Sequence, residues 1–255
     1  MKRTIENRQD VEMIRFELEQ FVDPEKQETL PRFFKTGRGE YGEGDHFLGI
    51  TVPHIRKVAR QHLGLSLDGL SQLLMSPWHE QRMCALLIMV EHAKCTTKPL
   101  WLKAHSEREA ETLRRNFYRF YLRHTHQINN WDLVDLSAPV IVGEYLMDKD
   151  RGILYQLADS SFLWDQRISI VSTSAFIKRN DFADIYALSE KLLHHPHDLM
   201  QKAIGWMLRE AGKRDKDRLT TFLDLHACEM PRTMLRYAIE KFPEDERLYY
   251  LKTSR

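Results

Sequence analysis

A tryptophan and a carboxylate stand four residues apart in the segment NNWDLVDLSAP, residues 129–139. If this segment is helical, Trp131 and Asp135 lie on one face, and Asn129 or Asn130 can cap its start. A carboxylate can stabilise developing positive charge and position water, and an indole face attracts a cation. From the spacing alone, a core tryptophan beside a surface aspartate is the favoured interpretation, although Asp132 and Asp135 lie close to the apolar Leu133, Val134 and Leu136.

A basic stripe that contains an aromatic residue follows in QKAIGWMLREAGKR. Helical spacing puts Lys202, Trp206 and Arg209 along one face, which fits a solvated helix edge or a surface that faces a polyanion. Gly205 is unfavourable inside a helix, so we expect another element to pack closely against it. Arg167, in LWDQR, is either a surface charge or a planar clamp for phosphate.

A glycine-rich stretch, GRGEYGEG, begins at Gly37 and matches the G-x-G-x-x-G spacing of dinucleotide-binding loops. Such a loop needs a strand before it and a helix after it, whereas the preceding LPRFFK has a helical pattern. Glu40, Glu43 and Asp45 would also place carboxylates where phosphate must sit. We therefore interpret the stretch as a flexible loop between two helices.

No metal site or cofactor is expected from the remaining motifs. WHEQRM resembles the H-E-x-x-H zinc motif, but Met83 stands where the second histidine is required. The histidines of HHPH, residues 194–197, fit a solvated loop. The odd cysteine set has no C-x-x-C pair, which suits a reducing cytoplasm; its members are Cys84, Cys95 and Cys228.

The composition is that of an ordinary water-soluble protein, with 42% hydrophobic and 29% charged residues in a chain of 255. The longest apolar run is too short to span a bilayer, and the N-terminus lacks the apolar core of a secretory signal. We expect a cytoplasmic protein without a membrane partner. The net charge of +1 neither supports nor excludes nucleic-acid binding, because the position of the basic residues matters more.

Helical periodicity dominates the chain and no segment alternates with period two, which predicts an all-α fold. Basic residues in similar helical segments recur at intervals of 35 and 34 positions, from Arg167 to Lys202 to Arg236. This period is typical of α-solenoids, whose inner helices would carry a basic stripe along a concave face. The predicted helices are Glu12–Phe21, Leu65–Met75, Glu80–Lys94, Glu107–His124, Ala183–Leu193, Met200–Lys213 and Arg232–Phe242.

These motifs, together with FFKTGRGEYGEGDHFLGITVPHIRKVAR, resemble the AlkD-like DNA alkylation repair family over about residues 20–245. That family consists of HEAT-like-repeat proteins and includes alkylpurine DNA glycosylases. The resemblance implies an α-α superhelix with a concave DNA-binding groove. We expect residues 1–255 to form a single monomeric domain, with residues 1–10 a candidate for disorder.

The resemblance also assigns roles to individual residues. The family's catalytic aspartate matches Asp135, and its two site tryptophans match Trp131 and Trp206. Its DNA-contacting arginine matches Arg167. Phe33 stands where the family carries an aromatic residue towards the lesion, and the hydroxyl of the tyrosine found in an active member is missing.

The implied reaction is hydrolysis of the N-glycosidic bond of N3- or N7-alkylated purines in duplex DNA, a base excision repair step without a cofactor. Lys202 and Arg209 would join Arg167 in holding phosphates, which makes binding salt-dependent. We expect Arg38 to contact a groove or a phosphate of the DNA, and the acidic residues of GRGEYGEG to be turned away from the DNA. Two alternatives stay open: a non-catalytic HEAT-repeat protein that binds branched or damaged DNA, and a protein-interaction scaffold.

Overall fold

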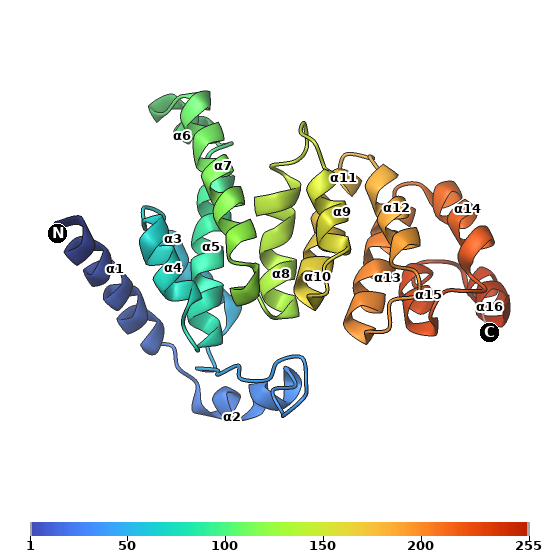
Figure 1. Cartoon of the computed structure of the whole chain (residues 1–255), viewed down its shortest axis with the longest axis horizontal. Coiled ribbons are helices and arrows are strands. Elements are labelled where there is room, and N and C mark those ends of the chain that lie inside the picture. Colours follow the sequence, from blue (N-terminus) through green and yellow to red (C-terminus); the bar gives the residue numbers. More distant parts are fainter. Residues whose placement is uncertain (1, 254–255) are drawn as a thin grey trace. The chain divides into compact units, whose positions relative to one another are not determined.

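The computed structural model describes residues 2–253 and is entirely helical over that range, with a single isolated β-bridge between His46 and Trp78 (Figure 1). This confirms the predicted all-α class and the α-α repeat type. Contacts divide the chain into two compact units, residues 1–137 and residues 138–255. The single domain and its concave groove stay predictions.

Unit 1 is built around one helix that is buried on every side. Its apolar run Met83–Val90 has no polar face, so the helix must be covered all round, and neighbouring helices pack against it. Unit 1 comprises α1 (Lys2–Glu19), α2 (Pro24–Phe33), α3 (Val52–Gln61), α4 (Leu67–Leu74), the buried helix α5 (His79–Cys95), α6 (Pro99–Ala104), α7 (Glu107–Arg123), the 3₁₀ turn η1 (Thr125–Gln127) and α8 (Trp131–Ala138), which ends one residue beyond the unit.

Unit 2 is built around α13 (Asp198–Gly212), which packs most extensively against α15 (Arg232–Ala238). A Cβ atom on Gly205 would lie 2.4 Å from the Met234 carbonyl oxygen, which confirms the predicted close approach at this glycine. The other elements are the π turn η2 (Pro139–Gly143), α9 (Gly152–Ala158), α10 (Leu163–Ser172), α11 (Ser174–Ile177), α12 (Ala183–Lys191), α14 (Lys216–His226) and α16 (Glu244–Thr253).

All seven predicted helices are present. Five agree within two residues at either end, α15 ends four residues earlier than predicted, and the seventh is the second half of α1. Helices α3, α6, α9, α14 and α16 were not predicted. Residues 2–10, a candidate for disorder in the sequence, form the first half of α1, and residue 1 lies outside the described residues. The segment continues a helix whose later turns bury Val11, Ile14 and Leu18.

No helix within residues 2–253 is both long and apolar enough to cross a membrane.

The glycine-rich loop, defined here as residues 34–51, connects α2 to α3. Its position between two helices is as predicted. Gly49 has a positive φ of 80°, and a Cβ atom there would lie 2.2 Å from the Asp23 carbonyl oxygen. Only glycine fits both requirements. The end of the loop therefore packs against the start of α2, and the flexibility predicted for residues 37–44 stays a prediction.

Candidate functional site

Helix α8 places Trp131 and Asp135 on one face, four residues apart. Asn130 precedes the helix; its side-chain oxygen accepts a hydrogen bond from the Trp131 backbone N–H at 2.8 Å. The Asn130 carbonyl accepts from the Val134 N–H at 3.2 Å and opens the helical hydrogen-bond ladder. Both site residues are half-buried, so they have contact with the protein interior and with solvent.

Three phenylalanines join Trp131 in an aromatic cluster. Phe34 stacks on the indole with ring centroids 5.4 Å apart, and Phe47 stacks on Phe34 at 4.8 Å. Phe33, at the end of α2, meets the indole edge to face at 6.0 Å. Phe34 and Phe47 are buried, whereas 63% of Phe33 is exposed. The structure thus brings two predicted site residues, Phe33 and Trp131, together at the surface of unit 1.

Beneath this cluster, a histidine of α5 lies between two carboxylates. The Nδ1 atom of His79 is 2.8 Å from Oδ2 of Asp45, and its Nε2 atom is 2.9 Å from Oδ2 of Asp132. Only 2% of His79 is exposed. Asp45 belongs to the glycine-rich loop and Asp132 to the first turn of α8. The imidazole therefore links the loop to the helix that carries Trp131 and Asp135.

Asp45 is held by two further side chains. Arg82 donates to its Oδ1 atom at 2.7 Å, and Asn130 donates to its Oδ2 atom at 3.1 Å. Burial alone would raise the pKa of the Asp45 carboxyl, but the bonds and charges of His79 and Arg82 hold it below the ordinary value. A buried aspartate with three donors is an anchor for the end of the glycine-rich loop.

His79 carries a positive charge in this setting. Burial by itself lowers the pKa of an imidazole, but the charges and hydrogen bonds of Asp132 and Asp45 outweigh it and raise the pKa of His79 to about 9. The geometry gives the same answer, because each ring nitrogen faces a carboxylate oxygen and both must carry a proton to donate. Near neutral pH, His79 is an imidazolium between two aspartates.

Glu80, the next residue of α5, binds the end of the glycine-rich loop. Its carboxylate accepts the backbone N–H groups of Leu48, Gly49 and Ile50 at 2.9, 2.8 and 3.2 Å. Burial raises the pKa of Glu80 despite these bonds. We call His79, Glu80 and Arg82 the α5 clamp, because the three side chains hold residues 45–50 of the loop.

The tip of the loop bonds to itself. Glu40 accepts the Gly37 N–H at 2.9 Å, and Glu43 accepts the Gly39 N–H at 2.8 Å. Backbone N–H groups that could cradle a phosphate are thus occupied by the loop's own carboxylates, which agrees with the rejection of a dinucleotide loop. Arg38 is exposed at the tip and makes no hydrogen bond or ion pair with the residues that the structure describes.

The negative charge of Asp135 affects the pKa of a buried tyrosine, Tyr121. Burial, with the negative charge of Asp135, raises the pKa of Tyr121. The Tyr121 hydroxyl lies 2.9 Å from the Ser137 hydroxyl, and Ser137 donates to the Leu133 carbonyl at 2.5 Å. The inner side of α8 is therefore fixed by a hydrogen-bond chain, while the Trp131 and Asp135 face reaches solvent.

The predicted basic residues of unit 2 have partners within that unit. Trp206 is half-buried on α13, and Lys202 of the same helix pairs with Asp198 at 2.7 Å. Arg209 pairs with Glu240 and, at 3.3 Å, with Glu210. If Lys202 or Arg209 holds a phosphate, it must exchange a carboxylate for it.

Arg167 is only 5% exposed and donates to the Leu199 carbonyl at 2.6 Å. That bond ties α10 to the second residue of α13, so the arginine has a structural role whatever else it contacts. Contact of Arg167, Lys202 and Arg209 with DNA stays a prediction.

The α5 clamp was not identified from the sequence. WHEQRM lacks the second histidine of a zinc motif, yet its polar residues directly precede the apolar run of a helix buried on all sides. Charged residues at the start of such a helix require buried partners, and that requirement was the signal. The partners themselves, Asp45 and residues 48–50, lie 30 to 37 positions away and could not be read from local spacing.

The histidines of HHPH have local roles. His195 lies 2.8 Å from the Gln166 side chain, and the Nδ1 atom of His197 accepts the Leu199 N–H at the start of α13. Within residues 2–253, no group of three or more His, Cys, Asp or Glu side chains is arranged to hold a metal ion.

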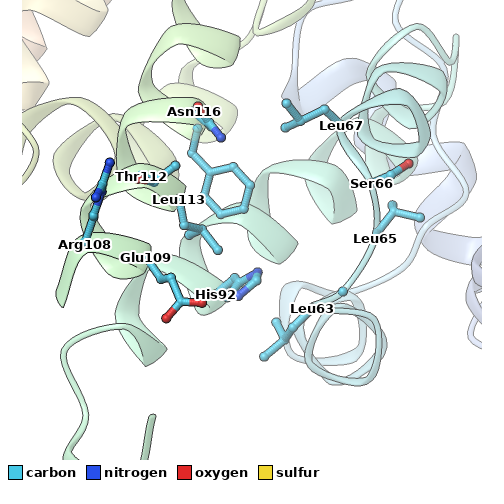
Figure 2. Close-up of a pocket in the computed structure, with 12 residues that line it drawn as sticks. Leu63, Leu65, Ser66, Leu67, His92, Arg108, Glu109, Thr112, Leu113 and Asn116 are labelled. Atoms are coloured by element: carbon cyan, nitrogen blue, oxygen red, sulfur yellow. The ribbon is translucent and has the colours of Figure 1, made fainter. Parts of the chain in front are cut away.

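A separate hollow of about 450 Å³ lies in unit 1, away from the predicted site residues. Figure 2 shows α7 side chains on one side, residues 63–67 opposite, and His92 between them. The lining is mainly apolar, with Leu63, Leu65 and Leu113 among its members. Burial lowers the pKa of His92, so its imidazole is neutral near pH 7. None of these residues belongs to the sequence-predicted site.

The family model and the solved structure that match this chain are both described as DNA alkylation repair enzymes. A family model described as DNA alkylation repair enzyme matches residues 14–242. A solved structure of a predicted DNA alkylation repair enzyme from Enterococcus faecalis is similar in fold, with a TM-score of 0.64 and 15% sequence identity. The alignment covers 88% of this chain and 97% of that one. No curated protein matches the chain.

Proposed function

This chain belongs to the DNA alkylation repair enzyme family, and on that premise we propose that it is a monofunctional DNA glycosylase. Membership supports a role in DNA repair and implies DNA as the substrate. The finer proposal is hydrolysis of the N-glycosidic bond of N3- or N7-alkylated purines in duplex DNA, by a monomer in the cytoplasm and without a cofactor.

The observation that carries the proposal is the solvent-facing side of α8. Trp131 and Asp135 share that face, and the exposed ring of Phe33 lies against the indole. An aromatic surface beside a half-buried carboxylate suits a substrate that is positively charged at the base and becomes positively charged at the sugar.

The substrate supplies much of the chemical drive. Alkylation at N3 or N7 leaves the purine with a positive charge, so the base departs as a neutral molecule when the C1′–N bond breaks and takes the bonding electrons. The sugar is left as an oxocarbenium ion. Asp135 stabilises that cation and accepts a proton from the water whose oxygen bonds to C1′. No general acid is needed for the leaving group.

The aromatic residues contribute smaller effects. Cation–π attraction at Trp131 and Trp206 is worth roughly 0.5–2 kcal/mol each, which corresponds to a change in rate of about 2- to 30-fold. Removal of a preorganised electrostatic group at a reacting centre typically costs about 10²–10³-fold. We therefore assign the main catalytic role to Asp135 and supporting roles to the two tryptophans.

The decisive experiment is release of free alkylated base from methylated duplex DNA, measured under single-turnover conditions. Wild type releases base, and Asp135→Asn slows release roughly 10²–10³-fold while helicity and duplex affinity are kept. The matched control is Asp68→Asn on α4, which removes an exposed carboxylate of unit 1 and leaves the rate unchanged.

Two outcomes overturn the proposal. If wild type releases nothing but binds DNA tightly and in a salt-sensitive way, the protein is a non-catalytic binder of branched or damaged DNA. If wild type releases nothing and does not bind DNA at low salt, the helical repeats form a protein-interaction scaffold.

A further inference from the structure

The proposed chemistry makes no use of the most deeply buried charged cluster in unit 1. His79, Asp45, Arg82 and Asp132 form it, and Asp132 adjoins Trp131 in the chain. We propose that His79 is a positioning residue, which sets the orientation of Trp131 and Asp135 by binding α8 to the glycine-rich loop. The effect on catalysis rests on the proposed glycosylase function, whereas the effect on Trp131 can be measured without it.

The first step is that His79 fixes Asp132 rather than merely touching it. The Oδ2 atom of Asp132 faces Nε2 of His79 at 2.9 Å, and its Oδ1 atom accepts the Leu133 N–H at 2.8 Å. Both carboxylate oxygens are therefore engaged, one by α5 and one by the backbone of α8. A carboxylate held at both oxygens transmits the position of the imidazole to the first turn of the helix.

The second step is that the other side of the imidazole is anchored equally well. Asp45 faces Nδ1 and is held by Arg82 and Asn130. The side-chain oxygen of Asn130 also accepts a hydrogen bond from the backbone N–H of Trp131. The cluster thus reaches the start of α8 by two routes, through Asp132 and through Asn130, and both begin at the same buried pair of Asp45 and His79.

The third step is a packing route to the indole. Phe47 stacks on His79 with centroids 4.7 Å apart, and Phe34 lies 5.2 Å from the same imidazole. Phe34 in turn stacks on Trp131. One face of Trp131 is therefore supported by rings that rest on His79, so a change of His79 acts on the indole directly as well as through the helix.

The fourth step is the charge balance. The loop contributes Asp45, α8 contributes Asp132, and α5 contributes Arg82 and the neighbouring Glu80 around the imidazolium. Asp45 and Asp132 are balanced by His79 and Arg82. When His79 loses a proton, one ring nitrogen presents a lone pair to a carboxylate and that contact becomes repulsive. Where that carboxylate is Asp132, the link between α5 and the start of α8 is broken. Asp45 would keep Arg82 and Asn130 as donors.

The test follows Trp131 and catalysis separately. In ¹H–¹⁵N spectra, the indole N–H of Trp131 is assigned with Trp131→Phe and followed from pH 6 to pH 10 in wild type and His79→Gln. The Trp131 signal of wild type moves with a midpoint close to the pKa of His79, about 9, and that of His79→Gln does not. Asp132→Asn lowers the midpoint, because it removes one carboxylate partner.

Single-turnover excision supplies the second readout. His79→Gln slows it roughly 10- to 100-fold, the cost of a small misplacement of reacting groups, with duplex affinity unchanged, and wild type slows in parallel above pH 9. The matched control is His62→Gln. His62 forms a different histidine–carboxylate pair of unit 1, with Glu17 at 2.9 Å, and that pair is only partly buried. Its excision rate stays that of wild type.

The outcomes are separable. The positioning role is overturned if the Trp131 signal does not change as His79 titrates. It is also overturned if His79→Gln excises at the rate of wild type. If His79→Gln does not fold, the wild-type titration alone decides. If wild type excises nothing, the proposed function fails, and the Trp131 titration still decides whether His79 positions the indole.

Discussion

The exposed ring of Phe33 meets the indole of Trp131 edge to face, with the ring centroids 6.0 Å apart. The two residues come from α2 and α8, almost a hundred positions apart in the chain, and both were singled out from the sequence. Their contact extends the aromatic surface beyond the single tryptophan that spacing within α8 provides. Because the ring of Phe33 is largely exposed, this residue can be changed with little effect on the core.

Phe33→Ala is therefore expected to slow base release without unfolding the protein. Loss of one aromatic contact, about 0.5–1.5 kcal/mol, corresponds to a several-fold lower single-turnover rate, and Phe33→Tyr keeps the rate because it keeps the ring. The matched control is Phe16→Ala on α1, another phenylalanine that is 60% exposed. Equal rates for the two alanine variants would remove Phe33 from the site.

Arg38→Ala is expected to weaken duplex binding. The exposed guanidinium has no described partner to give up, so a phosphate contact costs it no ion pair. If it contacts one phosphate, the slope of log affinity against log salt falls by about 1, measured by fluorescence anisotropy at several salt concentrations. Arg38→Lys keeps the charge and the slope. Unchanged binding by Arg38→Ala would make the loop tip a mere connector.

Glu80→Gln is expected to destabilise the protein. An amide NH₂ group cannot accept from Leu48, Gly49 and Ile50 as both carboxylate oxygens do, so at least one buried N–H loses its acceptor, at a cost of about 1–3 kcal/mol. Urea unfolding measures the loss. Glu40→Gln, which affects one exposed bond to Gly37 in the same loop, should cost much less. Similar values for both variants would contradict the role of the clamp.

Stability should fall as the pH rises from about 6.5 to about 9. The pKa of His79 is raised from its ordinary value of 6.5 to about 9, so between these values the folded protein holds a proton that the unfolded chain has released. The folded state then binds more protons, and the free energy of unfolding decreases with pH. The contribution of His79 is complete below pH 6.5.

Urea unfolding midpoints at several pH values test this dependence. Burial lowers the pKa of His92 and His195, which gives an opposite trend as pH rises towards and past 6.5. The difference between wild type and His79→Gln isolates the contribution of His79, and that difference should shrink as the pH approaches 9. A difference that is constant with pH would show that His79 is not charged.

The sequence identified those features that depend on local pattern. The helix of Trp131 and Asp135, the close approach at Gly205 and the loop between two helices all follow from spacing or from the properties of glycine. The sequence did not identify what depends on partners distant in the chain. Nothing around Asp45 marks it as buried, because its burial requires His79 and Arg82, and the neighbouring Glu40 and Glu43 are exposed.

The basic residues show the same limit. Helical spacing placed Lys202 and Arg209 correctly on α13, but spacing does not tell which carboxylates they meet. Asp198 is four residues from Lys202 and could have been anticipated. Glu240, the partner of Arg209, belongs to the segment just after α15 and becomes a neighbour only through the packing of α13 on α15, which Gly205 permits.

The glycine-rich loop is closed at its base by a hydrogen bond from the Gly42 N–H to the Lys35 carbonyl, 3.1 Å long. A Cβ atom on Gly42 would lie 2.4 Å from the Phe34 carbonyl oxygen, so the two strands of this neck touch. Thr36 and Tyr41 bond to α2 through the Pro31 and Phe33 carbonyls, so residues 37–40 between them form a cassette that can be lengthened or replaced while the neck stays closed. A fluorophore or a foreign peptide inserted at Gly39 would leave the neck and its contacts with α2 in place.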